Sequence, residues 1–436
     1  MAYEPVDVVE VRCWGSRAGA LALDTASGFY AFEYDPRWAR SGVELAPIAL
    51  PTVEAVGGPF IFPTLPVETF SRLPALIADS LPDDFGNALT TAYLANEGIR
   101  PDEITPLDRL AYLGTRGMGA LEFHPIRGPR TRKATAIKLS ELVVAARSAL
   151  AGEIGTEAGI TDALKHLIAI GTSAGGARAK VVVALNRTTG ELRSGQVPAA
   201  PGFEQWLLKF DGVGSDPDLG ATGNFGRIEY AYHLMAIAVG IEMMECRLLE
   251  EGGRAHFMTR RFDRQADGRK VHAQTLCAMS HLDFRQIGAH DYAQLFLLLD
   301  QLDLGPDSRA EVFRRMTFNV ASAICDDHTK NFAFLLPEGE GWRLSPAYDV
   351  THAHAPDSKW TRQHLMAVNG RSVGIGRADV MEVADRFAVP GASDIVDQVL
   401  ETVGKWRNFA DEAGVPEATT AHIAADIEMW SSPLRA

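Results

Sequence analysis

The pattern of hydrophobic residues changes character about 260 residues into the 436-residue chain. Before that point, short runs with strand character, such as AKVVVALN and FEQWLLKFDG, alternate with amphipathic helical segments. Beyond it, apolar residues recur mainly with the helical period, as in HDYAQLFLLLDQL and SRAEVFRRMTFNVASAI. The pattern predicts an α+β fold in which a mixed α/β region precedes a mostly helical one, with a hinge near residues 255–265.

The composition is that of a folded protein with a large core, because 46% of the residues are hydrophobic and 22% are charged. No apolar run reaches the roughly 18 residues that a membrane-spanning helix needs, and the start, MAYEPVDVVEV, lacks a secretory pattern. The four cysteines lie far apart without a CxxC pair, which indicates neither a disulfide framework nor a cysteine zinc site. We therefore expect a cytoplasmic protein that does not associate with membranes.

Charge limits the partners that the chain can bind directly. Lys and Arg number 42 against 56 Asp and Glu, so the formal net charge is −14. This excess disfavours a broad nucleic-acid surface, although it is compatible with a local patch or a basic partner. The segment IRGPRTRKATA (residues 126–136) carries four cations beside a Gly-Pro pair, which predicts an exposed linker. A partner-docking patch is the alternative for this segment.

A loop of small residues precedes the run VVVAL. It consists of Gly171, Thr172, Ser173, Ala174, Gly175, Gly176, Ala177, Arg178, Ala179 and Lys180. Small residues let backbone N–H groups approach an anion, and Lys180 adds positive charge. The loop lacks the GK[ST] ending of a Walker A motif, and a strand follows where a dinucleotide fingerprint needs a helix. A loop followed by a strand fits the glycine-rich loop of a kinase; a surface loop without a ligand is the alternative.

Lys209 lies inside the apolar run WLLKF. Burying a lysine is costly unless an anion meets it, so we interpret Lys209 as a phosphate ligand. Glu229, in the next predicted helix, is the candidate carboxylate that steadies it. The alternative is an edge-strand lysine whose ammonium group reaches water.

The segments CDDHTKN (residues 325–331) and SPAYDV (residues 345–350) carry the chemistry that is most specific in the chain. FAFLL and WRLSP between them read as two strands of a hairpin, and folding at the turn brings Asn331 opposite Asp349. Asp326 lies five residues before Asn331 in the same loop. Two acids and an amide at one end of a hairpin predict a Mg²⁺ phosphoryl-transfer site, in which one carboxylate accepts the hydroxyl proton.

Two other interpretations of these residues are open. The polar side chains could cap helices and turns without a catalytic role. His352 and His354 could instead join Asp349 and Asp326 in a zinc or manganese hydrolase site. The surrounding AHAPDSK has no second histidine motif near it, which disfavours the metal hydrolase.

The chain resembles the HipA-type serine/threonine kinases, the toxin halves of bacterial type II toxin–antitoxin pairs. The resemblance rests on LPDDFGN, GMGALEF, SAGGARAK, LLKFD, RRFDR, CDDHTKN and SPAYDV. It implies a two-lobed kinase-like fold with an amino-terminal subdomain at residues 1–127. A nucleotide-binding mixed α/β lobe at residues 137–258 and a helical catalytic lobe at residues 259–436 would follow.

The resemblance also implies roles for individual residues. Asp326 would be the catalytic base, and Asn331 and Asp349 the Mg²⁺ ligands. Residues at the ATP would be Ser173, Gly175, Gly176, Ala177, Arg178, Ala179, Lys180, Lys209, Arg260, Arg261, Phe262, His328, Lys330, Asn331 and Asp349. Within this set, the backbone of Arg260, Arg261 and Phe262 would meet adenine.

The implied reaction is transfer of the γ-phosphoryl group from Mg-ATP to a protein Ser or Thr. An aminoacyl-tRNA synthetase is among the implied targets, and its modification would arrest translation. The implied partner is a small helix-turn-helix antitoxin, through which the chain would contact DNA only indirectly. A catalytically weak co-repressor and a small-molecule phosphotransferase are the alternatives from other functional classes.

Ser173 is implied as a site of self-phosphorylation that inactivates the kinase, and this can be tested by mass spectrometry. A phosphate there adds a charge of about −1.5 to −2 where the phosphates of ATP would lie, so the modified loop should lose ATP binding. After incubation with Mg-ATP, we expect the phosphate on Ser173 of wild-type protein and not of Asp326→Ala. Unmodified wild-type protein, or normal ATP binding by the modified fraction, would contradict this role.

Overall fold

A computed structural model of the chain describes residues 4–82, 84–129, 139–140, 142–143, 179–195, 201–212 and 223–436. The contacts divide the chain into two compact units. The first unit comprises residues 1–214, 260–281 and 335–341. The second unit comprises residues 215–259, 282–334 and 342–436. The three predicted domain ranges stay predictions.

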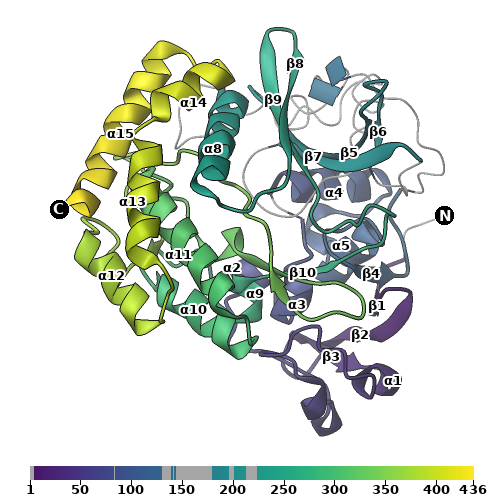
Figure 1. The fold of residues 1–436 in the computed structure, drawn as a ribbon. Helices are drawn as coiled ribbons and strands as arrows, with labels where there is room; N and C mark the ends of the chain where they lie inside the picture. Colours follow the sequence, from purple (N-terminus) through teal and green to yellow (C-terminus); the bar gives the residue numbers. More distant parts are fainter. Residues whose placement is uncertain are drawn as a thin grey trace. The chain divides into compact units, whose positions relative to one another are not determined.

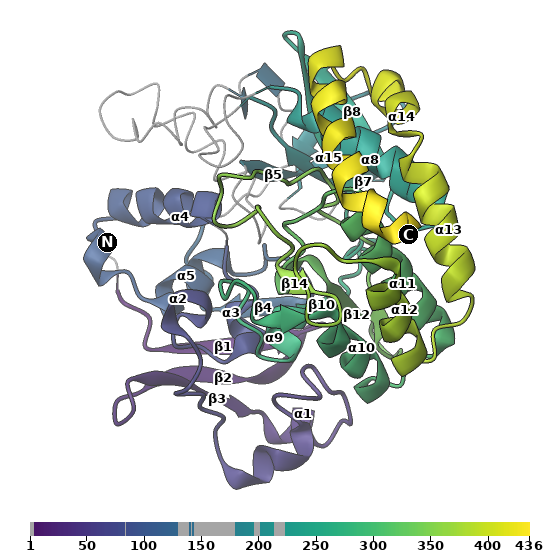
Figure 2. The ribbon, with the colours of Figure 1, turned by 90° about the vertical axis from the view of Figure 1, so that its left-hand side faces the viewer.

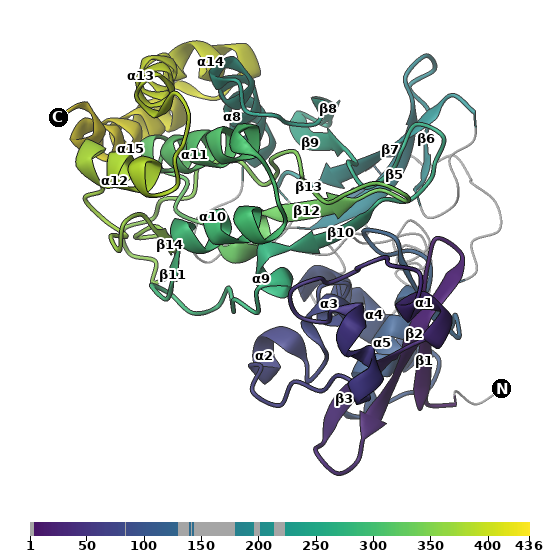
Figure 3. The ribbon, with the colours of Figure 1, turned by 60° about the horizontal axis from the view of Figure 1, so that its bottom comes forward.

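The first unit contains a four-stranded antiparallel sheet in the order β3-β2-β1-β4, whose first three strands run side by side in Figures 2 and 3. Its strands are β1 (Val8–Cys13), β2 (Ser16–Asp24), β3 (Phe29–Tyr34) and β4 (Leu121–His124). Every second residue of β1 is buried, as expected for a strand with one face on a core. Among the fully buried side chains of this unit are Phe32 on β3 and Phe123 on β4, the two edge strands of the sheet.

Short helices complete this part of the first unit. They are α1 (Pro36–Ala39), α2 (Val67–Phe70), α3 (Ala75–Ala78), α4 (Asp84–Asn96) and α5 (Pro106–Leu113). The helix α5 begins with a capping box, because Thr105 and Asp108 each accept a hydrogen bond from the other's backbone N–H. It packs against β1 and β4, and its buried face includes Leu107 and Leu110.

The first unit also holds the antiparallel strands β6-β5-β7 and the segment 260–281. The strands are β5 (Lys180–Asn186), β6 (Leu192–Ser194) and β7 (Phe203–Lys209). The segment 260–281 contains β10 (His272–Thr275) and α9 (Leu276–Met279). It is fixed to the amino-terminal part through Thr275, whose backbone N–H and hydroxyl both donate to the Asp79 carboxylate at 2.7 and 2.8 Å.

A buried ionic cluster joins RRFDR to GMGALEF within this unit. The carboxylate of Asp263 is fully buried, lies 2.7 Å from nitrogens of both Arg261 and Arg264, and accepts the Gly119 backbone N–H at 2.7 Å. Arg264 also donates to the carbonyl oxygens of Gly119 and Gly117, at 3.0 and 3.1 Å. Burial opposes ionisation of this carboxyl, but the two guanidinium groups and the Gly119 N–H hold the pKa of Asp263 well below its usual range.

The second unit is mostly helical. Its helices, which gather in green and yellow in Figure 1 apart from the teal α8, are α8 (Phe225–Val239), α10 (Tyr292–Gln301), α11 (Pro306–Ala321), α12 (Arg377–Arg386), α13 (Ala392–Val403), α14 (Trp406–Ala413) and α15 (Glu417–Arg435). The helix α11 is central, because it packs against α10, α13 and α15. Large side chains such as Phe313, Phe318 and Trp406 fill the core between them.

Short strands of the second unit position its loops. The hairpin of β8 (Cys246–Glu251) and β9 (Arg254–Arg260) follows α8. Two-residue strands β11 (His290–Asp291) and β14 (Met366–Ala367) pair in parallel. The predicted hairpin after Asn331 is present as β12 (Ala333–Leu336), whose last two residues are assigned to the first unit, and β13 (Arg343–Leu344). The Ser345 N–H donates to the Ala333 carbonyl at 2.9 Å.

The α+β prediction is confirmed, since strands and helices are mixed in the first part of the chain and helices dominate after residue 290. Among the helices in the described residues, none is long and apolar enough to cross a membrane.

Removing the Asp263 carboxylate should destabilise the fold severely. Asp263→Ala would leave two buried guanidinium groups without their counter-ion, a change that typically costs about 3–5 kcal/mol in the free energy of unfolding. Denaturant titration at pH 7 measures this loss.

The matched control is Asp267→Asn, because the Asp267 carboxylate pairs with Arg269 at 2.7 Å but is 53% exposed. Its unfolding free energy should stay near the wild-type value. Because the folded-state pKa of Asp263 is depressed, its stabilisation is present above the unfolded pKa of about 3.9 and is lost as the pH falls further. An Asp263→Ala protein as stable as the control would show that the cluster is dispensable.

Candidate active site

The loop that carries Asp326 follows α11 and ends in the short 3-10 helix η3 (Thr329–Asn331). The Asn331 side-chain N–H donates to the backbone carbonyl of Asp326 at 2.7 Å, and its backbone N–H donates to the His328 carbonyl at 2.9 Å. The five-residue spacing therefore closes the loop on itself. Since the amide nitrogen of Asn331 is used inside the loop, its amide oxygen is the atom left to face a ligand.

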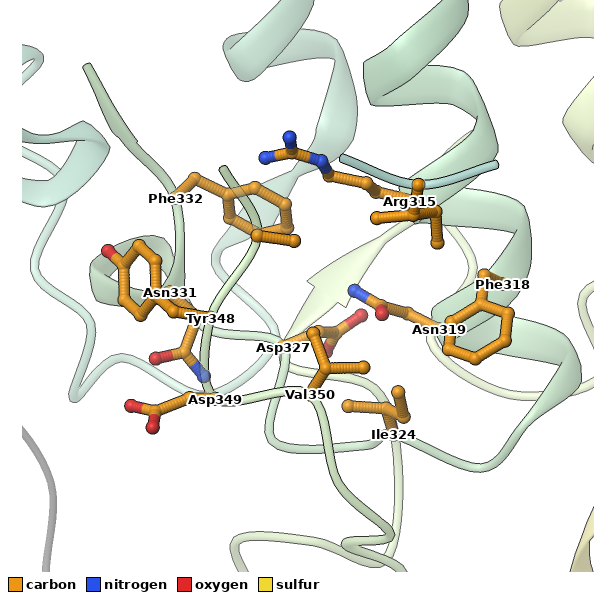
Figure 4. Close-up of a pocket in the computed structure, with 12 residues that line it drawn as sticks. Arg315, Phe318, Asn319, Ile324, Asp327, Asn331, Phe332, Tyr348, Asp349 and Val350 are labelled. Atoms are coloured by element: carbon orange, nitrogen blue, oxygen red, sulfur yellow. The ribbon is translucent and has the colours of Figure 1, made fainter. Parts of the chain in front are cut away.

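Asp349 and Asn331 line one pocket of the second unit, as the hairpin predicted (Figure 4). In Figure 4, the amide of Asn331 and the carboxylate of Asp349 lie on the same side of it. The pocket has a volume of about 20 Å³ and is lined by Ile241, Arg315, Phe318, Asn319, Ile324, Asp327, Asn331, Phe332, Ala347, Tyr348, Asp349 and Val350. Asp349 has a φ of 55°, a left-handed conformation that costs a non-glycine residue about 1–3 kcal/mol and is often found at functional sites.

The Asp326 side chain is 40% exposed, and its carboxylate has two polar contacts among the described residues. Its Oδ1 accepts the indole N–H of Trp360 at 2.6 Å and lies 3.8 Å from His328 Nε2. The pKa of Asp326 is raised, chiefly because its surroundings desolvate the charge and also because Asp349 and Asp327 are nearby acids; His328 and the Trp360 hydrogen bond oppose the rise. Sequence reasoning did not identify Trp360, and its position in the chain, 34 residues from Asp326, gave no signal.

Asp327, the next residue, has a fully buried carboxylate that accepts four hydrogen bonds. Its Oδ2 accepts the Tyr292 hydroxyl and the His364 Nδ1–H, each at 2.9 Å. Its Oδ1 accepts the backbone N–H groups of Leu365 and Met366 at 2.8 and 3.3 Å. Asp327 is therefore a structural anchor for the loop, which the pair of adjacent acids in CDDHTKN did not reveal.

His328 and Lys330 lie beside Phe284 in the second unit. The imidazole of His328 and the ring of Phe284 have centroids 5.2 Å apart, and the Lys330 ammonium lies 4.8 Å from the Phe284 ring centre. The Tyr348 hydroxyl donates to the Lys330 carbonyl at 2.6 Å, which joins the two sides of the hairpin. Both of these predicted ATP contacts are on the same loop as Asp326.

His352 and His354, the two histidines after Asp349, contact Asp426 and not the two acids of the hydrolase interpretation. His352 Nε2 and His354 Nδ1 lie 2.8 and 3.0 Å from the two carboxylate oxygens of Asp426 on α15. Burial, partly opposed by Asp426, lowers the pKa of His352, and the histidines lower the pKa of Asp426 against the opposing effect of its own burial. Within the described residues, no group of three or more His, Cys, Asp or Glu side chains is placed to hold a metal ion.

In the first unit, Lys180 and Lys209 are directly opposite each other on β5 and β7. Both are buried, with 3% and 8% of their surface exposed. Side chains at paired positions of antiparallel strands project to the same face, so both lysines bring positive charge to one face of these strands. Lys180 is the first residue of β5 rather than part of the preceding loop.

The other predicted residues are placed as follows. Ala179 is buried and accepts the Phe210 N–H at 3.0 Å. Arg260 ends β9, the Arg261 N–H donates to the Gln205 carbonyl at 3.0 Å, and Phe262 is half-buried. Ser173, Gly175, Gly176, Ala177 and Arg178 lie outside the described residues, as do residues 130–136 of the predicted linker. Glu229 is buried in α8, and its pairing with Lys209 stays a prediction.

Comparison with known proteins identifies relatives of the whole chain. A family model described as the HipA-like C-terminal domain matches residues 172–429, and one described as the HipA N-terminal domain matches residues 9–124. No curated protein matches the chain.

Among solved structures, the chain is similar to HipA of Shewanella oneidensis MR-1 in the complex of HipA, HipB and operator DNA. The TM-score is 0.64 at 14% identity, over 98% of this chain and 97% of that one. This likeness shows a shared fold. A weaker one, to the proinflammatory kinase CtkA of Helicobacter pylori, has a TM-score of 0.37 at 12% identity over 53% of this chain and 88% of the other, and supports no conclusion.

The two adjacent acids should respond differently to truncation. Asp327→Ala removes the acceptor of four buried donors and should lower the free energy of unfolding by about 3–5 kcal/mol, a loss typical of a buried charge network that is broken on one side. Asp326→Ala removes a partly exposed side chain and should leave the unfolding midpoint close to wild type. Thermal and denaturant unfolding of the two variants side by side test this, and equal losses would refute the division of roles.

Proposed function

Since the chain belongs to the HipA family, we propose that it is a Mg-ATP-dependent protein serine/threonine kinase and the toxin of a type II toxin–antitoxin pair. The proposal rests on one observation above all. Asn331 is hydrogen-bonded to the loop of Asp326 and shares a pocket with Asp349, which gives the acid, amide and acid of a phosphoryl-transfer site.

Asp326 is the proposed catalytic base. The acceptor hydroxyl oxygen attacks the γ-phosphorus of ATP, the bond from this phosphorus to the β–γ bridging oxygen breaks, and ADP leaves. The hydroxyl proton passes to the Asp326 carboxylate. The partial exposure of this carboxylate gives an acceptor access to it, and its raised pKa makes it a stronger base than an ordinary aspartate.

Asn331 and Asp349 are the proposed Mg²⁺ ligands. Both offer oxygen atoms, which Mg²⁺ prefers, and the amide nitrogen of Asn331 is already committed to the loop. Mg²⁺ commonly takes only one or two protein ligands and completes its shell with water and phosphate oxygens, so a cage of three acids is not required. When bound, the ion would neutralise charge on the phosphates.

The remaining predicted residues are proposed ATP contacts. In the second unit these are His328 and Lys330, on the loop of Asp326. In the first unit, the opposed lysines Lys180 and Lys209 supply the positive charge that phosphates need. The loop with Ser173, Gly175, Gly176, Ala177, Arg178 and Ala179 and the backbone of Arg260, Arg261 and Phe262 stay proposals from family resemblance.

The proposed partner is a small DNA-binding antitoxin of the helix-turn-helix type. Support comes from the similar Shewanella oneidensis protein, whose structure is a complex with HipB and operator DNA. A net charge of −14 favours indirect contact with DNA through such a partner. An aminoacyl-tRNA synthetase as the phosphorylated target is a hypothesis from the family. The cytoplasmic location stays a prediction from the sequence.

Transfer of labelled γ-phosphate, measured across a Mg²⁺ titration, tests the kinase proposal. Wild-type protein should label itself or a protein acceptor. Asp326→Ala should lose this transfer by about 100-fold or more while keeping its fold, because the base is gone. Asp349→Asn keeps an oxygen ligand but loses the charge that holds the cation, so its Mg²⁺ midpoint should rise.

The outcomes separate the functional classes. Normal transfer by folded Asp326→Ala would refute the assigned base, and an unchanged Mg²⁺ midpoint in Asp349→Asn would refute the assigned ligand. A wild-type protein that never turns over ATP, yet represses with an antitoxin, would favour the co-repressor. Labelling of a small molecule but of no protein would favour the small-molecule phosphotransferase.

A further inference from the structure

The catalytic loop has a neighbour from a distant part of the chain that no motif includes. The indole N–H of Trp360 donates to Asp326 Oδ1 at 2.6 Å, a short charge-assisted hydrogen bond. Resting on the kinase function proposed above, we propose that Trp360 is a positioning residue, which fixes the orientation of the Asp326 carboxylate toward the acceptor hydroxyl.

The two oxygens of Asp326 have different surroundings. Oδ1 faces Trp360 and, at 3.8 Å, His328 Nε2. Among the residues that the structure describes, no donor contacts Oδ2, and the side chain is 40% exposed. A donor on one oxygen fixes the carboxylate plane and leaves the other oxygen to accept the hydroxyl proton, which is the geometry that a base requires.

Trp360 lies in a turn whose hydrogen bonds restrict the position of its backbone and therefore of its indole ring. The backbone N–H groups of Trp360 and Thr361 both donate to the Ser358 hydroxyl oxygen, at 3.0 and 3.2 Å. Ser358 is 6% exposed, and its own N–H donates to the Ala355 carbonyl at 3.0 Å. A serine that bonds the next backbone amides is a rigid local motif.

The indole ring of Trp360 also packs against two aromatic rings. It lies edge-on to Phe284 with centroids 6.2 Å apart, and edge-on to His328 at 6.1 Å. Phe284 in turn contacts His328 at 5.2 Å. Two rings thus hold the indole against the loop of Asp326, and edge-to-face contacts of this kind add to the stability of the arrangement.

Indole N–H spectra of the protein without nucleotide test the contact directly. The chain has 7 tryptophans, and Trp360→Phe identifies the Trp360 signal by its loss. We expect this signal downfield, as for a donor to a carboxylate, and shifted upfield in Asp326→Ala. A Trp360 signal that ignores Asp326→Ala would overturn the contact, whether or not the protein proves to be a kinase.

Kinetics test the consequence. Trp360→Phe keeps an aromatic ring but lacks the donor, so kcat should fall about 10- to 100-fold, the loss expected when a catalytic group is misoriented, with KM for ATP unchanged. In an Asp326→Asn background, with its residual rate, the same substitution should have no further effect if Trp360 acts through Asp326.

The matched control is Trp14→Phe, because the Trp14 indole also donates one hydrogen bond, to the Lys270 carbonyl at 2.9 Å, in the first unit. It should leave kcat near wild type. An unchanged kcat in Trp360→Phe, or a raised one that marks Trp360 as a competitor of the acceptor, would overturn the proposal. Wild-type protein without any transfer would overturn the kinase function instead.

Discussion

The buried carboxylate of Asp327 is the interaction on which the candidate site depends. It is fully buried, and a charge in that position is tolerated only because four donors surround it. These donors come from α10 and from residues 364–366, which lead into β14, so the loop after α11 is tied to two other parts of the second unit. Asp326 follows from this constraint. With its neighbour fixed inward, the preceding carboxylate remains 40% exposed and faces Trp360.

A second buried acid fixes the other side of the site. Asp426 on α15 holds His352 and His354, three and five residues after Asp349. The segment after Asp349 is therefore pinned to the carboxy-terminal helix, while Tyr348 before it bonds the Lys330 carbonyl. Constraints on both sides explain how Asp349 can keep a left-handed backbone that costs free energy. The residues with proposed chemical roles are thus held in place by two buried acids, Asp327 and Asp426, that have no proposed role in the chemistry.

The sequence predicted local features well and long-range ones poorly. The α+β class, the hairpin after Asn331 and the strand around Lys209 follow from short-range periodicity and turn residues, and the structure has all three. The different environments of Asp326 and Asp327 could not be predicted, because the two are chemically identical neighbours. The hydrogen-bond donors to their carboxylates are distant in the chain: Trp360 and residues 364–366 lie 34 to 39 residues after them, and Tyr292 lies 35 residues before Asp327. For the same reason, the contact between Trp360 and Asp326 could not be predicted. The catalytic and ligand roles themselves stay predictions.

Motifs that carry a family resemblance need not carry chemistry. GMGALEF and RRFDR both support the resemblance, yet within the first unit they serve each other: the Gly119 N–H and the Arg261 and Arg264 guanidinium groups converge on Asp263. Gly119 has a φ of 74°, and a Cβ there would lie 3.1 Å from the Ala273 backbone nitrogen, so both its conformation and its close approach favour glycine. Arg261 illustrates the consequence. Its side chain is bound to Asp263, so any contact that this residue makes with a nucleotide falls to its backbone.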